Sequence, residues 1–175
     1  MNLDNQVETI LRHAVGMSMI VGNQFVTPEH ILYGMTTEKQ FIKAFKSMGG
    51  NIDELIDDLN EYFEEMLPKR QGAFDAEKAD VSVGFSSTME MAVEIAKNSG
   101  NTVVKMTHVL WAMYEQQESF AVYFIEKQVK DKQEFLIRVA ELLEEEEETE
   151  KQNISQEAGS FRLLCFICAK RKRSV

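Results

Sequence analysis

Histidine and cysteine are the residue types in this 175-residue sequence that could support metal binding or catalysis. His30 and His108 lie 78 residues apart in similar surroundings, T-P-E-H-I-L and K-M-T-H-V-L. Histidine is a common metal ligand and general base, but neither residue has a cysteine or carboxylate at ligand spacing on its own predicted helix. We interpret both as structural histidines held by a hydrogen bond, with a ligand or base role as the alternative.

Cys165 and Cys168 form a C-x-x-C pair near the C-terminus. A structural zinc site needs four ligands and no second pair exists, while a redox motif would lie between a strand and a helix. We therefore regard the pair as incidental. The sequence also lacks a G-x-x-x-x-G-K-[ST] phosphate-binding loop, and its helices suggest no nucleophile–base pair. We expect no catalytic residue, cofactor or metal site, and no ATP hydrolysis.

Charge and composition restrict the partners further. The formal net charge is −10, so an acidic surface would repel nucleic acid, while polypeptide partners remain open. The N-terminus lacks the features of a signal peptide, and a cytoplasmic location is expected. Residues 161–175, FRLLCFICAKRKRSV, combine a short apolar run with clustered cations. Such a tail supports at most weak, reversible membrane attachment, and we interpret it as disordered or aberrant, not as an anchor.

A duplication organises the rest of the chain. At an offset of 78 residues, apolar and small residues recur in the same order. The matches include Leu11 with Met89, Ala14-Val15 with Ala92-Val93, Gly22-Asn23 with Gly100-Asn101, His30 with His108, and Met35 with Met113. After about residue 40 the offset grows by one, which aligns Phe45 with Phe124. Two half-domains of one design explain this pattern.

Apolar residues at helical spacing, and few Gly or Pro residues, predict an all-α fold in which each half contains four helices. The helices are predicted at 3–21, 27–38, 41–48, 51–68, 85–98, 106–115, 118–127 and 131–147. Thr27 can cap the second helix, with Pro28 at its first position and Glu29 in its first turn. Lys105 and Met106 replace that Thr-Pro start in the second half.

The predicted fold is a pseudo-twofold duplicated four-helix repeat of about eight helices. The domain is expected over 1–148, with repeats at about 1–67 and 85–148 and a connector at 68–84. Glu dominates residues 141–150, so the last helix should pass into a polar linker. Residues 149–175 are expected to form a disordered acidic linker and short tail.

The duplicated T-P-E-H-I-L unit, together with E-S-F-A-V-Y at 118–123, resembles the Clp N-terminal domain over about residues 1–140. The second motif is most similar to the ClpA-type unfoldase subunit of the Clp protease. The resemblance implies a non-catalytic module that recruits substrate polypeptides and a ClpS-type adaptor. In the parent assembly it would work with the Clp ATPase modules and ClpP, and the isolated domain is expected to be a monomer.

The resemblance also implies a binding site. Glu29 matches an acidic residue of the family's adaptor-facing surface, and Gln24, Ser82 and Ser87 occupy neighbouring positions. Val83 and Phe85 are expected to form an apolar or backbone-binding edge where the connector meets the second repeat. The alternative function is a stand-alone regulatory decoy that competes for the adaptor, and a weaker one is a recruiter tethered to a membrane by residues 161–175.

Overall fold

A computed structural model describes residues 1–70, 80–116, 119–146, 148, 149 and 151 of the chain. It divides into two compact units, 1–139 and 140–175. The described residues of the second unit are helical, and almost all of the predicted linker and tail lies outside the described residues. Within the described part, no helix is both long and apolar enough to cross a membrane.

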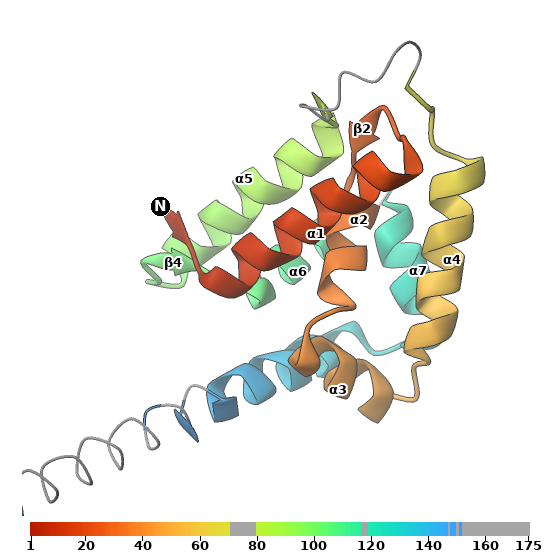
Figure 1. Cartoon of the computed structure of the whole chain (residues 1–175). Coiled ribbons are helices and arrows are strands. Elements are labelled where there is room, and N and C mark those ends of the chain that lie inside the picture. Colours follow the sequence, from red (N-terminus) through yellow and green to blue (C-terminus); the bar gives the residue numbers. More distant parts are fainter. Residues whose placement is uncertain (71–79, 117–118, 147, 150, 152–175) are drawn as a thin grey trace, which may run out of the picture. The chain divides into compact units, whose positions relative to one another are not determined.

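The fold is all-α and duplicated, as predicted. The helices of the first repeat are α1 (Asn5–Val21), α2 (Pro28–Met35), α3 (Lys39–Ser47) and α4 (Ile52–Glu65). The second repeat contains α5 (Val83–Asn98), α6 (Met106–Glu115), α7 (Phe120–Gln128) and a helical segment at 132–146 (Figure 1). The helix predicted at 85–98 begins two residues earlier, at Val83. Ser82 caps it there by accepting the Phe85 N–H at 3.0 Å.

In the part of the chain that the structure describes, four two-residue strands join the two repeats, and the helical periodicity did not predict them. They are β1 (Asn2–Leu3), β2 (Phe25–Val26), β3 (Asp80–Val81) and β4 (Val103–Val104). β1 pairs with β4 and β2 with β3, both in parallel. Asn2 faces Val103 in one ladder and Phe25 faces Asp80 in the other. Asp80 is the repeat equivalent of Asn2, and Val103 that of Phe25, so the duplication relates the two strand pairs to each other. Each strand pair contains one strand from each side of the duplication.

The same symmetry holds for the turns that position α2 and α6. Gly22 and Gly100 follow α1 and α5 with φ of 76° and 73°, in the left-handed region that glycine adopts without strain. These turns lead the chain back so that α2 packs against α1, and α6 against α5. At the first crossing, a Cβ on Gly34 would collide with the backbone carbonyl of Ile10. The α1–α2 contact therefore requires glycine at that position.

His30 and His108 each accept a hydrogen bond from the residue that precedes their helix, α2 or α6. This confirms the interpretation of the two residues as histidines held by a hydrogen bond. His30 Nδ1 accepts the Thr27 backbone N–H at 3.1 Å, and His108 Nδ1 accepts the Lys105 N–H at 2.9 Å. Thr27 therefore holds the cap position, and its hydroxyl also lies 3.0 Å from His30 Nδ1. Lys105 reproduces the bond from the backbone N–H.

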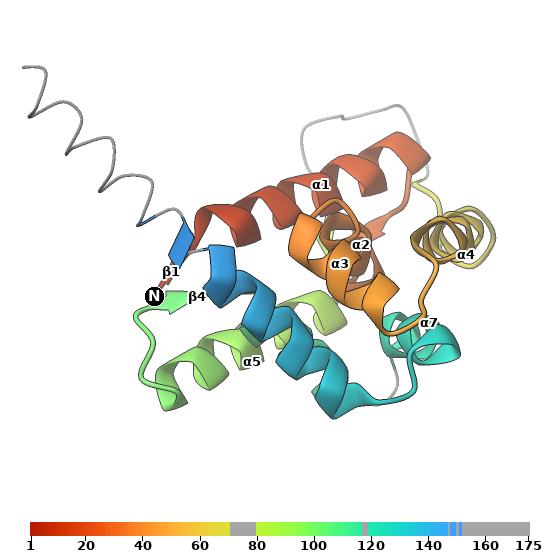
Figure 2. The same ribbon diagram turned by 90° about the horizontal axis from the view of Figure 1, so that it is seen from below.

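An aromatic cluster fills the core below α3. Phe41 and Phe45 of α3 are buried, and their ring centroids lie 5.6 Å and 5.9 Å from that of Phe135. Figure 2 shows α3 beside the helical segment that carries Phe135. Of the methionines predicted to face inward, Met35 and Met113 are fully buried, whereas Met89 is half-buried. Met106 is also buried, whereas the remaining methionines are half-buried or exposed, so methionine fills the core at only some of its positions.

Candidate functional site at the junction of the repeats

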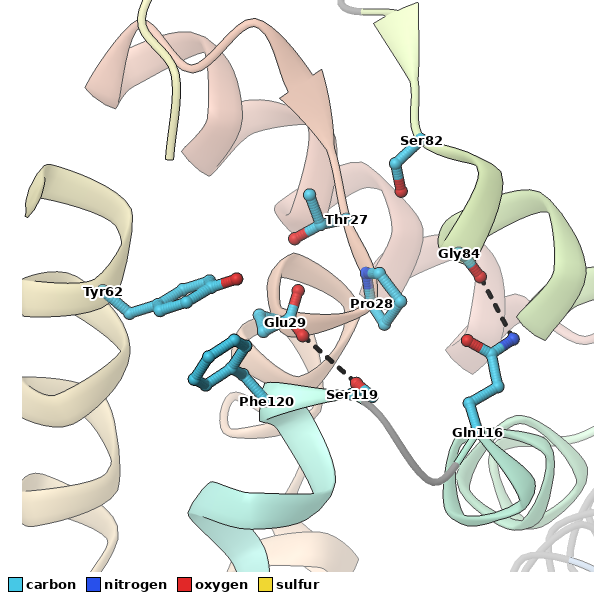
Figure 3. A pocket seen from close by; sticks show the side chains of 9 residues that line it. All are labelled: Thr27, Pro28, Glu29, Tyr62, Ser82, Gly84, Gln116, Ser119 and Phe120. Atoms are coloured by element: carbon cyan, nitrogen blue, oxygen red, sulfur yellow. Dashed lines mark hydrogen bonds between the residues drawn. The ribbon is translucent and has the colours of Figure 1, made fainter. Parts of the chain in front are cut away.

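A pocket lies where the start of α2 meets α4, the start of α5 and the residues before α7 (Figure 3). Its volume is about 470 Å³. It is lined by Thr27, Pro28, Glu29, Tyr62, Ser82, Gly84, Gln116, Ser119 and Phe120. The first four residues belong to the first repeat and the others to the second repeat or its cap, so the pocket exists only when both repeats are assembled.

Glu29 connects the two repeats at the floor of this pocket. Its side chain is only 4% exposed, and Oε1 accepts the Ser119 hydroxyl at 3.1 Å and the Ala121 N–H at 3.2 Å. The carboxylate thus sits at the N-terminus of α7 while belonging to the first turn of α2. Both helix dipoles favour a negative charge at this point, which offsets the cost of burying it.

Tyr62 of α4 faces Glu29 across the pocket, with its hydroxyl directed inward (Figure 3). Burial, and next the negative charge of Glu29, raise the pKa of Tyr62 to about 12. The phenol therefore stays protonated at neutral pH and can donate a hydrogen bond. Phe120 packs beside it, with ring centroids 5.0 Å apart.

Gln116 and Gly84 form the opposite wall. Gln116 Nε2 donates to the Gly84 carbonyl at 3.2 Å, which ties the end of α6 to the start of α5. A Cβ on Gly84 would lie 3.3 Å from Pro28 Cγ, so glycine lets α5 approach α2 closely. The pocket thus combines a carboxylate, a phenol and an amide with an aromatic wall. This arrangement suits the binding of a polypeptide segment by hydrogen bonds and apolar contact.

The structure brings only two of the six predicted binding residues to this pocket, Glu29 and Ser82. Gln24 is exposed, and its backbone N–H donates to the Pro68 carbonyl at 2.8 Å. Val83 is 84% exposed, as an apolar edge requires, while Ser87 is exposed and Phe85 half-buried. A binding role for all six stays a prediction.

Sequence reasoning missed Tyr62, Gln116, Ser119 and Phe120 as pocket residues. The E-S-F-A-V-Y motif contains Ser119 and Phe120, so a signal was present at those positions. The sequence contains no such signal for Tyr62. A tyrosine next to the buried Phe63 is equally typical of a partly covered helix face and of a binding site.

The sequence of the described domain matches the family model for the Clp repeat (R) N-terminal domain over residues 2–128. The chain belongs to this Clp N-terminal domain family. That match contains both repeats up to the end of α7, and hence all nine pocket residues.

Named relatives agree with the family. A ClpA homolog protein of Fuscovulum blasticum is 21% identical over 127 residues, which are 73% of this chain but 16% of that protein. The Hsp104 N-terminal domain from Candida albicans superposes with a TM-score of 0.68 at 16% identity, over 81% of this chain and 91% of that one. The N-terminal domain of the ClpV1 ATPase from E. coli gives 0.63 at 16% identity, over 81% and 85%.

The family match establishes a Clp N-terminal domain. The sequence relative is named a ClpA homolog, and the two structural neighbours are the N-terminal domains of Hsp104 and of the ClpV1 ATPase. The structural likenesses, at low identity, establish the fold alone. The chain spans about a sixth of the length of its ClpA-type relative (16%), so the activity of a complete unfoldase is not assigned by them.

Proposed function

We propose that this domain recruits polypeptides for a ClpA-like ATP-dependent unfoldase that feeds the ClpP protease. It would bind substrate proteins directly or through a ClpS-type adaptor, in the cytoplasm. The family match and the ClpA-type relative support this assignment. The observation that carries it furthest is the junction pocket, where a nearly buried carboxylate lies among hydrogen-bonding groups and beside an aromatic ring.

The dimensions of the pocket fit a short stretch of polypeptide. A volume of about 470 Å³ is enough for one or two side chains and the backbone between them. Glu29 Oε1 is engaged by α7, whereas its second oxygen lies on the pocket side beside Tyr62 (Figure 3). That oxygen could accept from a backbone N–H or a cationic group, and the Tyr62 hydroxyl could donate to a carbonyl.

Binding of purified ClpS, and separately of an unfolded protein such as casein, to the full chain tests the proposal by titration calorimetry. A Glu29→Gln variant keeps the size of the side chain and removes its charge. We expect binding to weaken at least about tenfold, because a charge-assisted hydrogen bond becomes a neutral one. Glu94→Gln, an exposed carboxylate on α5, is the matched control and should bind as the wild type does.

A thermal melt of each variant separates a binding effect from unfolding. If neither ClpS nor unfolded protein binds the folded wild-type chain, the recruitment function is wrong. If both bind, but Glu29→Gln and the wild type bind equally well, polypeptides are recruited elsewhere than at the pocket.

A further inference from the structure

Two exposed aromatic side chains and a half-buried one adjoin one another at the pocket. We call this the aromatic patch and define it as Tyr62 of α4 with Phe120 and Tyr123 of α7. Phe120 is 45% exposed and Tyr123 is 59% exposed. The ring centroids of Tyr62 and Phe120 lie 5.0 Å apart, and those of Phe120 and Tyr123 lie 6.5 Å apart. The rings therefore form one continuous apolar surface across two helices.

The duplication provides an internal comparison for this surface. With the offset of 79 residues that aligns α3 with α7, Phe120 corresponds to Phe41 and Tyr123 to Ala44. Both residues of α3 are completely buried. On α7 the equivalent rings are only partly covered, 45% exposed for Phe120 and 59% for Tyr123. Core packing therefore accounts for only part of the aromatic surface of α7.

Carboxylates surround the aromatic patch. Asp58 and Glu65 lie one turn before and after Tyr62 on α4, and therefore on the same side of that helix. Glu29 lies at the inner end, in the pocket. Lys127 of α7 pairs with Asp58 at 2.8 Å and approaches Glu54 at 3.7 Å. Four carboxylates against one ammonium leave the surroundings of the patch negative.

We propose that the aromatic patch docks a basic, apolar segment of a partner polypeptide. This inference rests on the proposed recruitment function and specifies the chemistry of the segment recruited. Arginine and lysine are attracted to the faces of Tyr and Phe rings by cation–π interaction, and the neighbouring carboxylates add ionic attraction. Leucine or phenylalanine side chains of the same segment would cover the exposed rings. An acidic segment would be repelled by the same carboxylates.

The test is fluorescence anisotropy of the full chain with two short labelled peptides that share their leucines. One carries arginine, and the other carries glutamate at the same positions. The double variant Phe120→Ser plus Tyr123→Ser removes the exposed rings, which are not core residues. Ile20→Ser replaces the 82%-exposed Ile20 of α1 and is the control for loss of an exposed apolar side chain.

We expect the arginine peptide to bind at least about tenfold more tightly than the glutamate peptide. The double variant should lose about tenfold in affinity for the arginine peptide, and Ile20→Ser less than about twofold. Equal affinity for both peptides, or unchanged binding by the folded double variant, would overturn the inference. If ClpS and casein still bind through Glu29 in that case, the recruitment function stands and only the role of the aromatic patch is wrong.

Discussion

The imidazole of His30 lies flat against the ring of Phe63, with centroids 4.1 Å apart and planes inclined by 8°. Its Nδ1 accepts the Thr27 N–H, so the proton of the neutral ring is on Nε2, which lies 3.2 Å from Asn23 Oδ1. Both nitrogens are therefore used in the neutral form. Burial lowers the pKa of His30 from 6.5 to about 4. A second proton would break the Nδ1 bond.

Stability should therefore fall as the pH falls from about 6.5 to about 4. In this window the unfolded chain protonates His30 while the folded chain does not, so acid favours unfolding by about 3 kcal/mol in total. Above pH 6.5 this contribution is constant. Urea denaturation across the window measures it, with His30→Gln as the comparison, since glutamine does not titrate.

The pKa of His108 is also lowered, first by burial and next by the charge of Lys105. His108 therefore adds to the loss of stability at low pH in the wild type and in His30→Gln alike. The variant should therefore lose part of the dependence on pH. An identical slope in the wild type and in His30→Gln would contradict the assignment of this titration to His30.

Asn23→Ala should destabilise the fold by about 1–3 kcal/mol, because its removal leaves buried polar groups unpaired. Asn23 Nδ2 donates to the Phe63 carbonyl at 2.8 Å, and its Oδ1 faces His30. The repeat equivalent Asn101 is half-exposed and lies 3.4 Å from His108 Nε2. Asn101→Ala is thus the matched control, and chemical denaturation should show a clearly smaller loss for it.

Phe41→Ala and Phe120→Ala remove the same side chain from equivalent positions of the two repeats. Phe41 is fully buried against Phe45 and Phe135, so its loss should cost about 3–5 kcal/mol. Phe120 is 45% exposed, and its loss should cost less than about 1.5 kcal/mol. The free energies of unfolding from denaturant titrations test this order. Similar losses would show that Phe120 is a core residue, and not part of a free surface.

Two glycine substitutions should act in opposite directions. Gly34→Ala places a methyl group against the Ile10 carbonyl and must push α1 and α2 apart, at a cost of about 2 kcal/mol or more. Gly16→Ala in α1 meets nothing within 4 Å and should stabilise by about 0.5–1 kcal/mol. Thermal melting measures both shifts. A stable Gly34→Ala protein would mean that this helix crossing tolerates separation.

The sequence predicted the helices well because their signals are local. Met106 and Glu115 bound a helix whose limits follow directly from the spacing of its apolar residues. The duplication was visible because both repeats need the same residues where α2 packs on α1 and α6 on α5. The histidines were read correctly, since the cap bond joins residues only three positions apart.

The pocket was harder to predict because its walls come from distant parts of the chain. Glu29 and Ser119 are 90 residues apart, and no periodicity indicates that they bond. The pattern around Phe120 resembles that around Phe41, yet only Phe41 is completely covered, since Phe135 packs against it. Which of two similar faces remains exposed is decided by tertiary packing. The two-residue strands are too short to show the alternation of a sheet.

The strand pairs imply something about how such a molecule is built. β1 of the first repeat is completed by β4 of the second, and β3, at the head of the second repeat, by β2 of the first. A single repeat would expose two unpaired strand edges, which a second copy of itself could satisfy in the same register. The protein has the architecture of a reciprocal homodimer of two repeats joined in one chain, in which the first copy carries Glu29 and the second Phe120 and Tyr123.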